Sequence, residues 1–165
     1  MPSLASTPAQ AADLEELARE AVFDLCPDLM EIETPLQDEP SIKARGYEFL
    51  GSRTHPRAGL MDVVSLEADD GTITIGNSRE TSACQVGISG GGAEAAFAAV
   101  YANRNALGYD WFEDTAPVRG IEGAEVVSLR TAAVDGWYLG IQFIDMGGVD
   151  GDWPFFIQQY VLEEE

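Results

Sequence analysis

Two cysteines, Cys26 and Cys84, are the residues with the widest choice of chemistry, because a thiol can act as a nucleophile, bind a metal or form a disulfide. Cys26 ends an apolar stripe with helical spacing that starts at Leu14, so its side chain is expected on a buried helix face. The neighbouring Asp24 and Asp28 disfavour a thiolate. These features argue against a nucleophilic role for Cys26.

Cys84 alternates with Val86 and Ile88 in a segment with strand periodicity, so the three side chains are expected on one buried face. Helix face and strand face would then point into the same core. Two alternatives follow, a Cys26–Cys84 disulfide or two buried free thiols. The disulfide would stabilise the fold by about 4 kcal/mol in chain-entropy terms, and it would persist only in an oxidising compartment.

His55 is the single histidine, and it lies between Arg53 and Arg57 in a stretch that also contains a proline. This setting is typical of an exposed loop residue. The sequence contains no Gly-x-Ser-x-Gly motif, and one histidine with two distant cysteines does not make a tetrahedral zinc site. We therefore predict no catalytic residue and no cofactor. Carboxylate or metal-assisted enzyme chemistry is the less favoured alternative, since none of the 29 acidic residues is marked out by spacing.

A glycine-rich segment formed by Ser89, Gly90, Gly91 and Gly92 follows a predicted strand and precedes a predicted helix. Backbone N–H groups at such a junction can bind an anion, which makes these four residues a candidate anion-binding site. No lysine follows, as a phosphate-binding Walker motif requires, and Glu94 would compete for the helix start. A plain strand-to-helix joint is the favoured interpretation.

Three carboxylates, Asp145, Asp150 and Asp152, lie within eight residues that also contain glycines. Calcium prefers oxygen ligands, so the segment is a candidate calcium loop. Its spacing differs from that of the EF-hand loop, and aspartate and glycine are also common at hairpin turns. A turn is the favoured interpretation.

The elements that must position these residues follow from hydrophobic periodicity. A first helix is predicted over residues 11–26, where Pro27 ends or kinks it, and a short second helix continues to residue 33. Ser41 is expected to cap a helix over residues 42–50, followed by an irregular segment to residue 59. The remaining predictions are strands over 61–68, 72–76 and 83–88, a helix over 93–107, a connector over 108–123, and strands over 124–131, 136–144 and 153–162.

Asp-Gly pairs at Asp70-Gly71 and Asp135-Gly136 predict hairpin turns. The element order is therefore helices, three strands, helix, three strands. We expect an α+β fold with a single antiparallel sheet of five or six strands and with helices packed on one face.

The length and composition suit one compact domain, with 165 residues of which 45% are hydrophobic. Residues 12–165 are predicted to form it. Residues 1–11 contain the small-x-small pattern Ala9-Gln10-Ala11, without the basic start and apolar core of a signal peptide. Two interpretations stay open, a signal-peptide remnant or a flexible lead-in. No apolar run is long enough for a membrane span, so membrane insertion is not expected.

The net charge of −20 is the most unusual property of the composition. Such a chain repels phosphate backbones, which argues against nucleic acid as a partner. Twelve acidic and only two basic residues fall in the segment 110–165. A solvated, solubilising surface is the favoured interpretation of this charge, and an acidic face that binds a basic protein surface is the alternative.

Three short segments together, Phe23-x-x-Cys26, Ala44-x-Gly46-Tyr47 and Ser82-Ala83-Cys84-Gln85-Val86, resemble small exported proteobacterial proteins of unknown function. The resemblance covers residues 12–90. It implies a periplasmic or secreted domain with one disulfide, and it transfers no activity.

We therefore expect a non-catalytic exported acidic binding domain. The alternative is a cytoplasmic acidic chaperone, immunity protein or inhibitor of a basic protein partner. Free thiols would favour the cytoplasmic alternative, whereas a disulfide would favour export.

Overall fold

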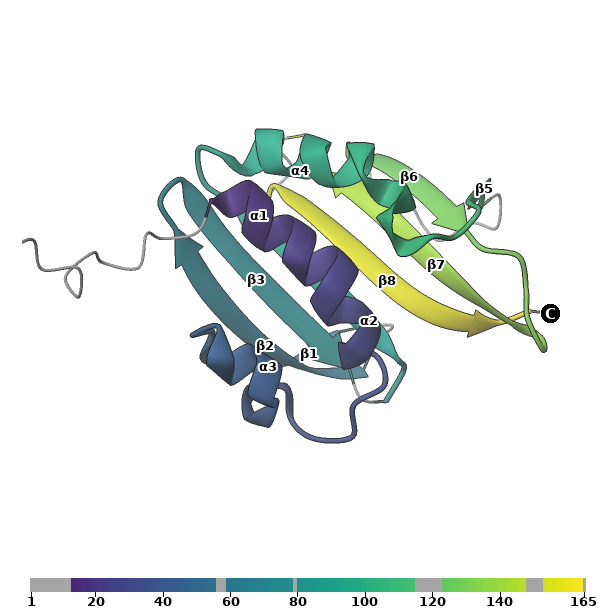
Figure 1. Ribbon diagram of the computed structural model, residues 1–165, viewed down its shortest axis with the longest axis horizontal. Coiled ribbons are helices and arrows are strands. Elements are labelled where there is room, and N and C mark those ends of the chain that lie inside the picture. The colour runs from purple at the N-terminus through teal and green to yellow at the C-terminus, as the bar shows by residue number, and fades with distance from the viewer. Residues whose placement is uncertain (1–12, 56–58, 79, 115–122, 148–152, 165) are drawn as a thin grey trace, which may run out of the picture.

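The computed structural model describes residues 13–55, 59–78, 80–114, 123–147 and 153–164. Within them the strands form one antiparallel eight-stranded sheet of order β1-β2-β3-β4-β8-β7-β6-β5 (Figure 1). The helical elements are α1 (Leu14–Arg19), the π-helix η2 (Glu20–Leu25), α2 (Cys26–Leu29), the 3₁₀ helix η3 (Leu36–Asp38), α3 (Pro40–Ala44), α4 (Ala93–Ala102) and the 3₁₀ helix η4 (Arg104–Leu107). The strands are β1 (Glu48–His55), β2 (Gly59–Ala68), β3 (Gly71–Ser78), β4 (Ala83–Ser89), β5 (Phe112–Glu113), β6 (Glu125–Arg130), β7 (Trp137–Asp145) and β8 (Phe155–Glu163).

The α+β class and the antiparallel sheet are confirmed, but the prediction of five or six strands is wrong. The largest error concerns β1, which occupies positions predicted as helix and irregular chain. Gly46 adopts a φ of +84°, a left-handed conformation that commonly ends a helix, so α3 stops at Ala44. The chain then extends along β2, and the Ser52 hydroxyl donates a hydrogen bond to Asp62 at 2.9 Å.

The predicted hairpins are present. β2 and β3 pair from Met61↔Ser78 to Ala68↔Gly71, with the turn at Asp69 and Asp70. At the turn before β7, Asp135 and Gly136 have φ values of 52° and 83°, as a two-residue type I′ turn requires. The residue types at these two turns are therefore sufficient to predict the hairpins.

The main core lies between one face of the sheet and the helices α1, η2, α2 and α4, and Figure 1 shows α1 and α4 side by side over the strands. Strand residues on this face include Val64, Ile75, Val86 and Phe143, all at most 2% exposed. Their alternation along each strand places the remaining side chains on the opposite face, which no described helix covers. We call that side the helix-free face.

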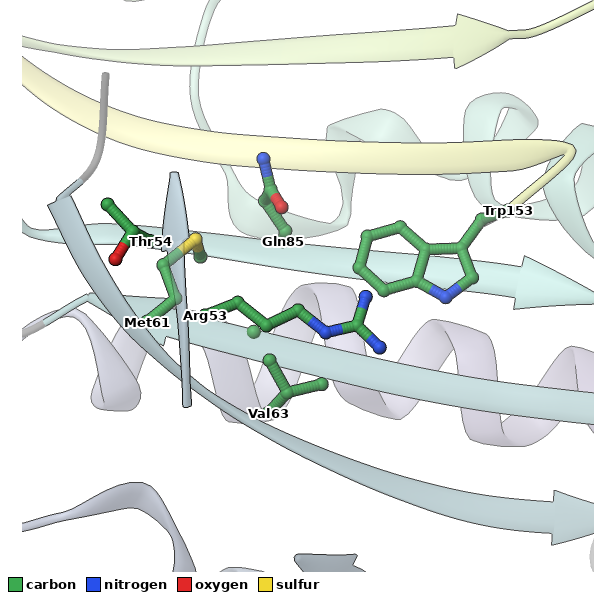
Figure 2. Close-up of a pocket in the computed structure, with 7 residues that line it drawn as sticks. Arg53, Thr54, Met61, Val63, Gln85 and Trp153 are labelled. Carbon is green, nitrogen blue, oxygen red and sulfur yellow. The ribbon is translucent and has the colours of Figure 1, made fainter. Parts of the chain in front are cut away.

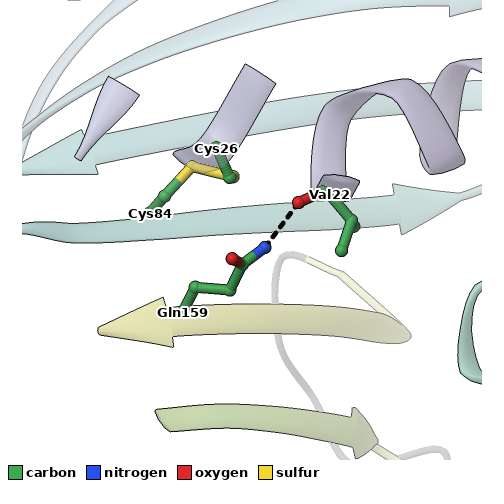
Figure 3. Close-up of a disulfide and its surroundings, with 4 residues drawn as sticks. All are labelled: Val22, Cys26, Cys84 and Gln159. Atoms are coloured by element: carbon green, nitrogen blue, oxygen red, sulfur yellow. Dashed lines mark hydrogen bonds between the residues drawn. A yellow bond between two sulfur atoms is a disulfide. The ribbon is translucent and has the colours of Figure 1, made fainter. Parts of the chain in front are cut away.

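Pro27 was predicted to end or kink the first helix, with a short second helix after it, and the structure shows no end at this residue. The helical run continues through the π-helix η2 into α2, and the Cys26 N–H donates to the Ala21 carbonyl, five residues back. If this i−5 hydrogen bonding continued, the N–H of residue 27 would donate to the Val22 carbonyl. Residue 27 is a proline, which has no N–H to donate. The buried side chain of Gln159 in β8 donates instead, with its Nε2 at 2.7 Å from the Val22 oxygen (Figure 3).

The predicted lead-in or signal remnant, residues 1–11, lies outside the described residues. No described helix has the length and apolar composition that crossing a membrane requires.

Candidate binding groove

The structure contains the predicted disulfide between Cys26 and Cys84 (Figure 3). The two Cα atoms are 5.6 Å apart, and both side chains are completely buried. The bond joins α2 to β4 across the core, at the level where Gln159 reaches Val22. Its role is structural, since neither sulfur is accessible to a substrate.

The other residues singled out from the sequence are not assembled into one site. Asp145 lies in β7 and accepts a hydrogen bond from the Gly147 N–H at 2.9 Å, whereas Asp150 and Asp152 lie outside the described residues. Among the described residues no group of three or more histidine, cysteine or acidic side chains could hold a metal ion. The calcium loop therefore stays a prediction. His55 ends β1 rather than lying in an irregular loop.

The candidate anion-binding segment packs against the β2–β3 turn. Ser89 ends β4, and the Gly92 N–H donates to the Asp70 carbonyl at 2.8 Å. A Cβ atom at Gly92 would lie 2.2 Å from the Asp70 carboxylate, so the glycine permits this close approach. A carboxylate thus already lies beside the loop, and anion binding at Ser89, Gly90, Gly91 and Gly92 stays a prediction.

A groove of about 310 Å³ runs between α4 and the outer strands of the sheet. We call it the α4–β6 groove, and its lining residues are Glu94, Phe97, Ala98, Tyr101, Glu125, Val127, Phe143, Asp145 and Phe155. Helical spacing places Phe97 and Tyr101 on one side of α4, one turn apart. Strand alternation places Val127, Phe143 and Phe155 on the face beneath them.

Aromatic rings form the floor of the groove. The ring centroid of Phe97 is 5.0 Å from that of Phe155 and 6.3 Å from that of Phe143. Tyr101 meets Phe143 edge to face at 5.1 Å. Such contacts hold the rings in place, so the floor is preformed. Val127 is 40% exposed and offers apolar surface at the groove.

Carboxylates form the rim. Glu94 stands in the first turn of α4, while Glu125 in β6 lies directly opposite Asp145 in β7. Like charges at directly opposed positions of an antiparallel pair destabilise a sheet. No basic side chain is among the described residues that line this groove. The Glu125–Asp145 pair is therefore unfavourable in the isolated protein, and a bound cation would relieve its repulsion.

A second, separate hollow of about 580 Å³ shares one lining residue, Tyr101, with the groove. Here the Arg104 guanidinium lies over the Tyr101 ring, 4.5 Å from its centroid. The Trp111 indole N–H donates to the Arg104 carbonyl at 2.9 Å, and the Tyr109 and Trp111 rings are 5.7 Å apart. Aromatic side chains thus line both hollows, which lie on either side of Tyr101.

Sequence reasoning did not find this groove. Phe97 lies in the segment predicted as a helix over residues 93–107 and Phe143 in the segment predicted as a strand over residues 136–144, and both elements are present in the structure. The groove also requires β8, which carries Phe155, to pair between β4 and β7. No local sequence pattern indicates that pairing. The one available signal was the four-residue spacing of Phe97 and Tyr101 next to the acidic segment.

No family model, curated protein or solved structure matches this chain. The functional argument therefore depends on the geometry of the groove.

Proposed function

We propose that this protein is a non-catalytic binding domain of an oxidising compartment, periplasmic or extracellular, and that it holds a basic, partly apolar protein segment in the α4–β6 groove. The proposal depends mainly on one observation: Glu125 and Asp145 lie opposite each other on neighbouring strands, beside the aromatic floor of the groove. A lysine or arginine of the partner would neutralise the two carboxylates, while an adjacent apolar side chain packs on the rings.

The net charge of −20 supports this choice of partner, because it accelerates association with a basic surface. The buried disulfide supports the compartment, since such bonds are rare in the reducing cytosol. The cytoplasmic alternative makes the same prediction for the groove but requires free thiols.

The test uses a panel of 12-residue peptides that carry two lysines or arginines next to one leucine or aromatic residue. Fluorescence anisotropy at low and high salt measures their binding to the full chain. We expect saturable binding that weakens with salt, and a loss of about two- to thirty-fold in affinity for Glu125→Gln/Asp145→Asn, since each exposed charge pair contributes roughly 0.2–1 kcal/mol. The variant should also reduce the salt dependence.

The matched control is Glu31→Gln/Glu33→Gln, which removes the same charge from exposed positions after α2. It should bind the peptides as the parent chain does. Val127→Ser tests the apolar contribution at a half-exposed position, and weaker binding is expected without a change in the unfolding temperature. Equal affinities for both charge variants, or no binding by any peptide of this class, would overturn the proposal.

A further inference from the structure

The hollow of about 580 Å³ that shares Tyr101 with the α4–β6 groove has a lining of a different kind. We call it the η4 hollow, because most of its lining residues lie in η4 and in the short segment that follows. Its volume falls within the range of roughly 300–1,000 Å³ that small-molecule sites occupy. Side chains with aromatic rings or hydrogen-bonding groups predominate in the lining: Tyr101, Arg104, Asn105, Tyr109, Asp110 and Trp111.

A left-handed glycine and one side-chain hydrogen bond fold the segment after η4 back onto the helix. Gly108 has a φ of +77° and ends η4, and its N–H donates to the Asn105 carbonyl at 2.9 Å. The Trp111 indole then donates to the Arg104 carbonyl, seven residues back, and Phe112 starts β5 beside β6. The segment 108–111 is thus anchored at both ends, which gives the hollow a defined shape.

Two aromatic rings provide apolar surface in the hollow. The planes of the Tyr109 and Trp111 rings meet at 69°, so the two rings pack edge to face and hold each other in place. Tyr109 is 48% exposed, which leaves part of its side chain accessible to a ligand. A pyranose ring with equatorial hydroxyls turns its C–H groups toward both ring faces. Such an apolar face packs well against an aromatic ring.

The polar side chains of the hollow include both donors and acceptors. The Arg104 guanidinium lies over the Tyr101 ring and donates one hydrogen bond, to the Tyr101 carbonyl at 3.0 Å. Within the part of the chain that the structure describes, its other N–H groups have no acceptor. The exposed side chains of Asn105 and Asp110 likewise have no partner among the described residues. A ligand can therefore find donors and an ionised acceptor in one place.

This mixture suits a neutral ligand that is rich in hydroxyl groups. A hydroxyl both donates and accepts, so a sugar can accept from Arg104 and Asn105 while it donates to Asp110. A small anion would be attracted by Arg104 but repelled by Asp110, and a small cation would meet the opposite combination. The net charge of −20 also disfavours acidic polysaccharides.

The pocket on the helix-free face differs, because its main polar side chains are already engaged by the protein (Figure 2). Arg53 and Gln85 both interact within the chain, and Gln85 Nε2 donates to Gln158 Oε1 at 2.9 Å. Its volume of about 200 Å³ is also below the range given above. The η4 hollow is therefore the more suitable cavity for a polar ligand.

We infer that the η4 hollow binds a neutral oligosaccharide built from pyranose rings with equatorial substituents. One sugar ring packs on Tyr109 and Trp111, and its hydroxyls form hydrogen bonds with Arg104, Asn105 and Asp110. The inference does not depend on the proposed function, because neither Tyr109 nor Asp110 lines the α4–β6 groove.

The probes are cellotriose and chitotriose, two neutral trisaccharides with equatorial substituents. Sorbitol, which has hydroxyls but no ring, tests the stacking, and choline tests whether the aromatic rings select a cation instead. Each probe is titrated into the full chain, and the backbone amide signals of residues 108–112 report binding in two-dimensional NMR spectra. We expect saturable shifts with at least one trisaccharide, about tenfold weaker binding of sorbitol, and no saturable shift with choline.

Two variants test the stacking ring and the acceptor separately. Tyr109→Ala should weaken trisaccharide binding about tenfold, whereas Tyr109→Phe retains the ring and should stay within about twofold of the parent chain. Asp110→Ala should also weaken binding about tenfold, because it removes a hydrogen bond to a charged group. Thermal unfolding of each variant checks that the fold is retained.

The matched controls lie near the opposite edge of the sheet, in β1 and beside β2. Phe49→Ala removes an aromatic ring at a 47% exposed position, and Asp38→Ala removes a carboxylate at an exposed position in η3. Both should bind the trisaccharide as the parent chain does. The inference is overturned if neither trisaccharide shifts the signals saturably, if sorbitol or choline binds as tightly, or if Tyr109→Ala and Phe49→Ala bind alike.

Discussion

Tyr47 is a buried side chain whose hydroxyl has no hydrogen-bond partner among the described residues. It follows the left-handed Gly46 in the short segment of chain between α3 and β1. Burial raises the pKa of the Tyr47 phenol well above its ordinary value of about 10, and the negative charge of Glu20 adds to the shift while Arg45 opposes it. The folded protein therefore retains a proton that the unfolded chain loses in alkaline solution.

This shift predicts a pH dependence of stability. Below pH 10 both states are protonated at Tyr47, whereas above it the unfolded state loses the proton first, so stability falls as the pH rises, by up to about 1.4 kcal/mol per pH unit. Tyr47→Phe should match or exceed the parent stability at pH 7, because the lost hydroxyl had no partner. It should lose less stability than the parent between pH 10 and 12, as measured by urea denaturation.

Tyr109→Phe, at a 48% exposed position, is the control and should follow the parent curve. Parallel curves for Tyr47→Phe and the parent chain would contradict the prediction.

At the scale of elements, the long N-terminal helical run contains a proline without breaking. Because η2 has i−5 hydrogen bonding, the carbonyl that lacks a backbone donor at Pro27 is that of Val22. The Gln159 side chain of β8 donates to this carbonyl. A side chain from the sheet thereby replaces a missing backbone donor of the helix. This arrangement ties the helix register to the position of β8.

The replacement predicts coupling between Gln159 and Pro27. Gln159→Met should lower the free energy of unfolding by about 1–2 kcal/mol, because an unsatisfied buried carbonyl costs roughly 1–3 kcal/mol. The change also removes the Gln159 side-chain oxygen, which has no hydrogen-bond partner in the part of the chain that the structure describes, and this offsets part of the cost. Pro27→Ala restores an N–H that can donate to Val22. The same Gln159→Met change should therefore cost less in the Pro27→Ala background, and a double-mutant cycle in urea measures the difference. If the double variant loses as much unfolding free energy as the two single variants together, this account is contradicted.

Elements with strong local signals were predictable from the sequence. Cys26 and Cys84 were placed on buried faces by periodicity alone, and the Asp135-Gly136 turn followed from its residue types. β1 was not predictable in the same way. Phe49 and Leu50 are apolar neighbours that suit helix or strand, and their strand conformation depends on pairing with β2 and on the stop at Gly46. Tertiary pairing outweighed local propensity there.

At the scale of the whole molecule, the Cys26–Cys84 bond links the helical layer to the sheet across 58 residues of sequence. In the unfolded chain this link removes conformational freedom, which stabilises the folded state by comparison. It also fixes which end of the helical run lies over β4. The bond therefore secures the packing of the two layers.

Removing this link with Cys26→Ala/Cys84→Ala should lower the free energy of unfolding by about 4 kcal/mol, measured by urea denaturation. In freshly isolated native protein, reduction under denaturing conditions should add two hydrogen atoms to the intact mass. A double variant with unchanged stability would contradict the structural role of the bond. An unchanged mass would instead contradict the proposed oxidising compartment.

The α4–β6 groove depends on long-range pairing, and this explains why the sequence did not reveal it. Its aromatic floor needs β8 beside β7 and the helix α4 above them, an arrangement that a turn alone does not produce. Hydrophobic periodicity reports which face of an element is buried. It does not report which distant element covers that face.

The central position of β8 also has a consequence for biosynthesis. β1 to β4 and β5 to β7 are each consecutive along the chain, and only residues 155–163 join them into one sheet. A ribosome must therefore release almost the entire described chain before the two halves can unite. Until then each half presents an unsatisfied strand edge, so the nascent polypeptide stays accessible to chaperones and to strand pairing with other chains until β8 emerges.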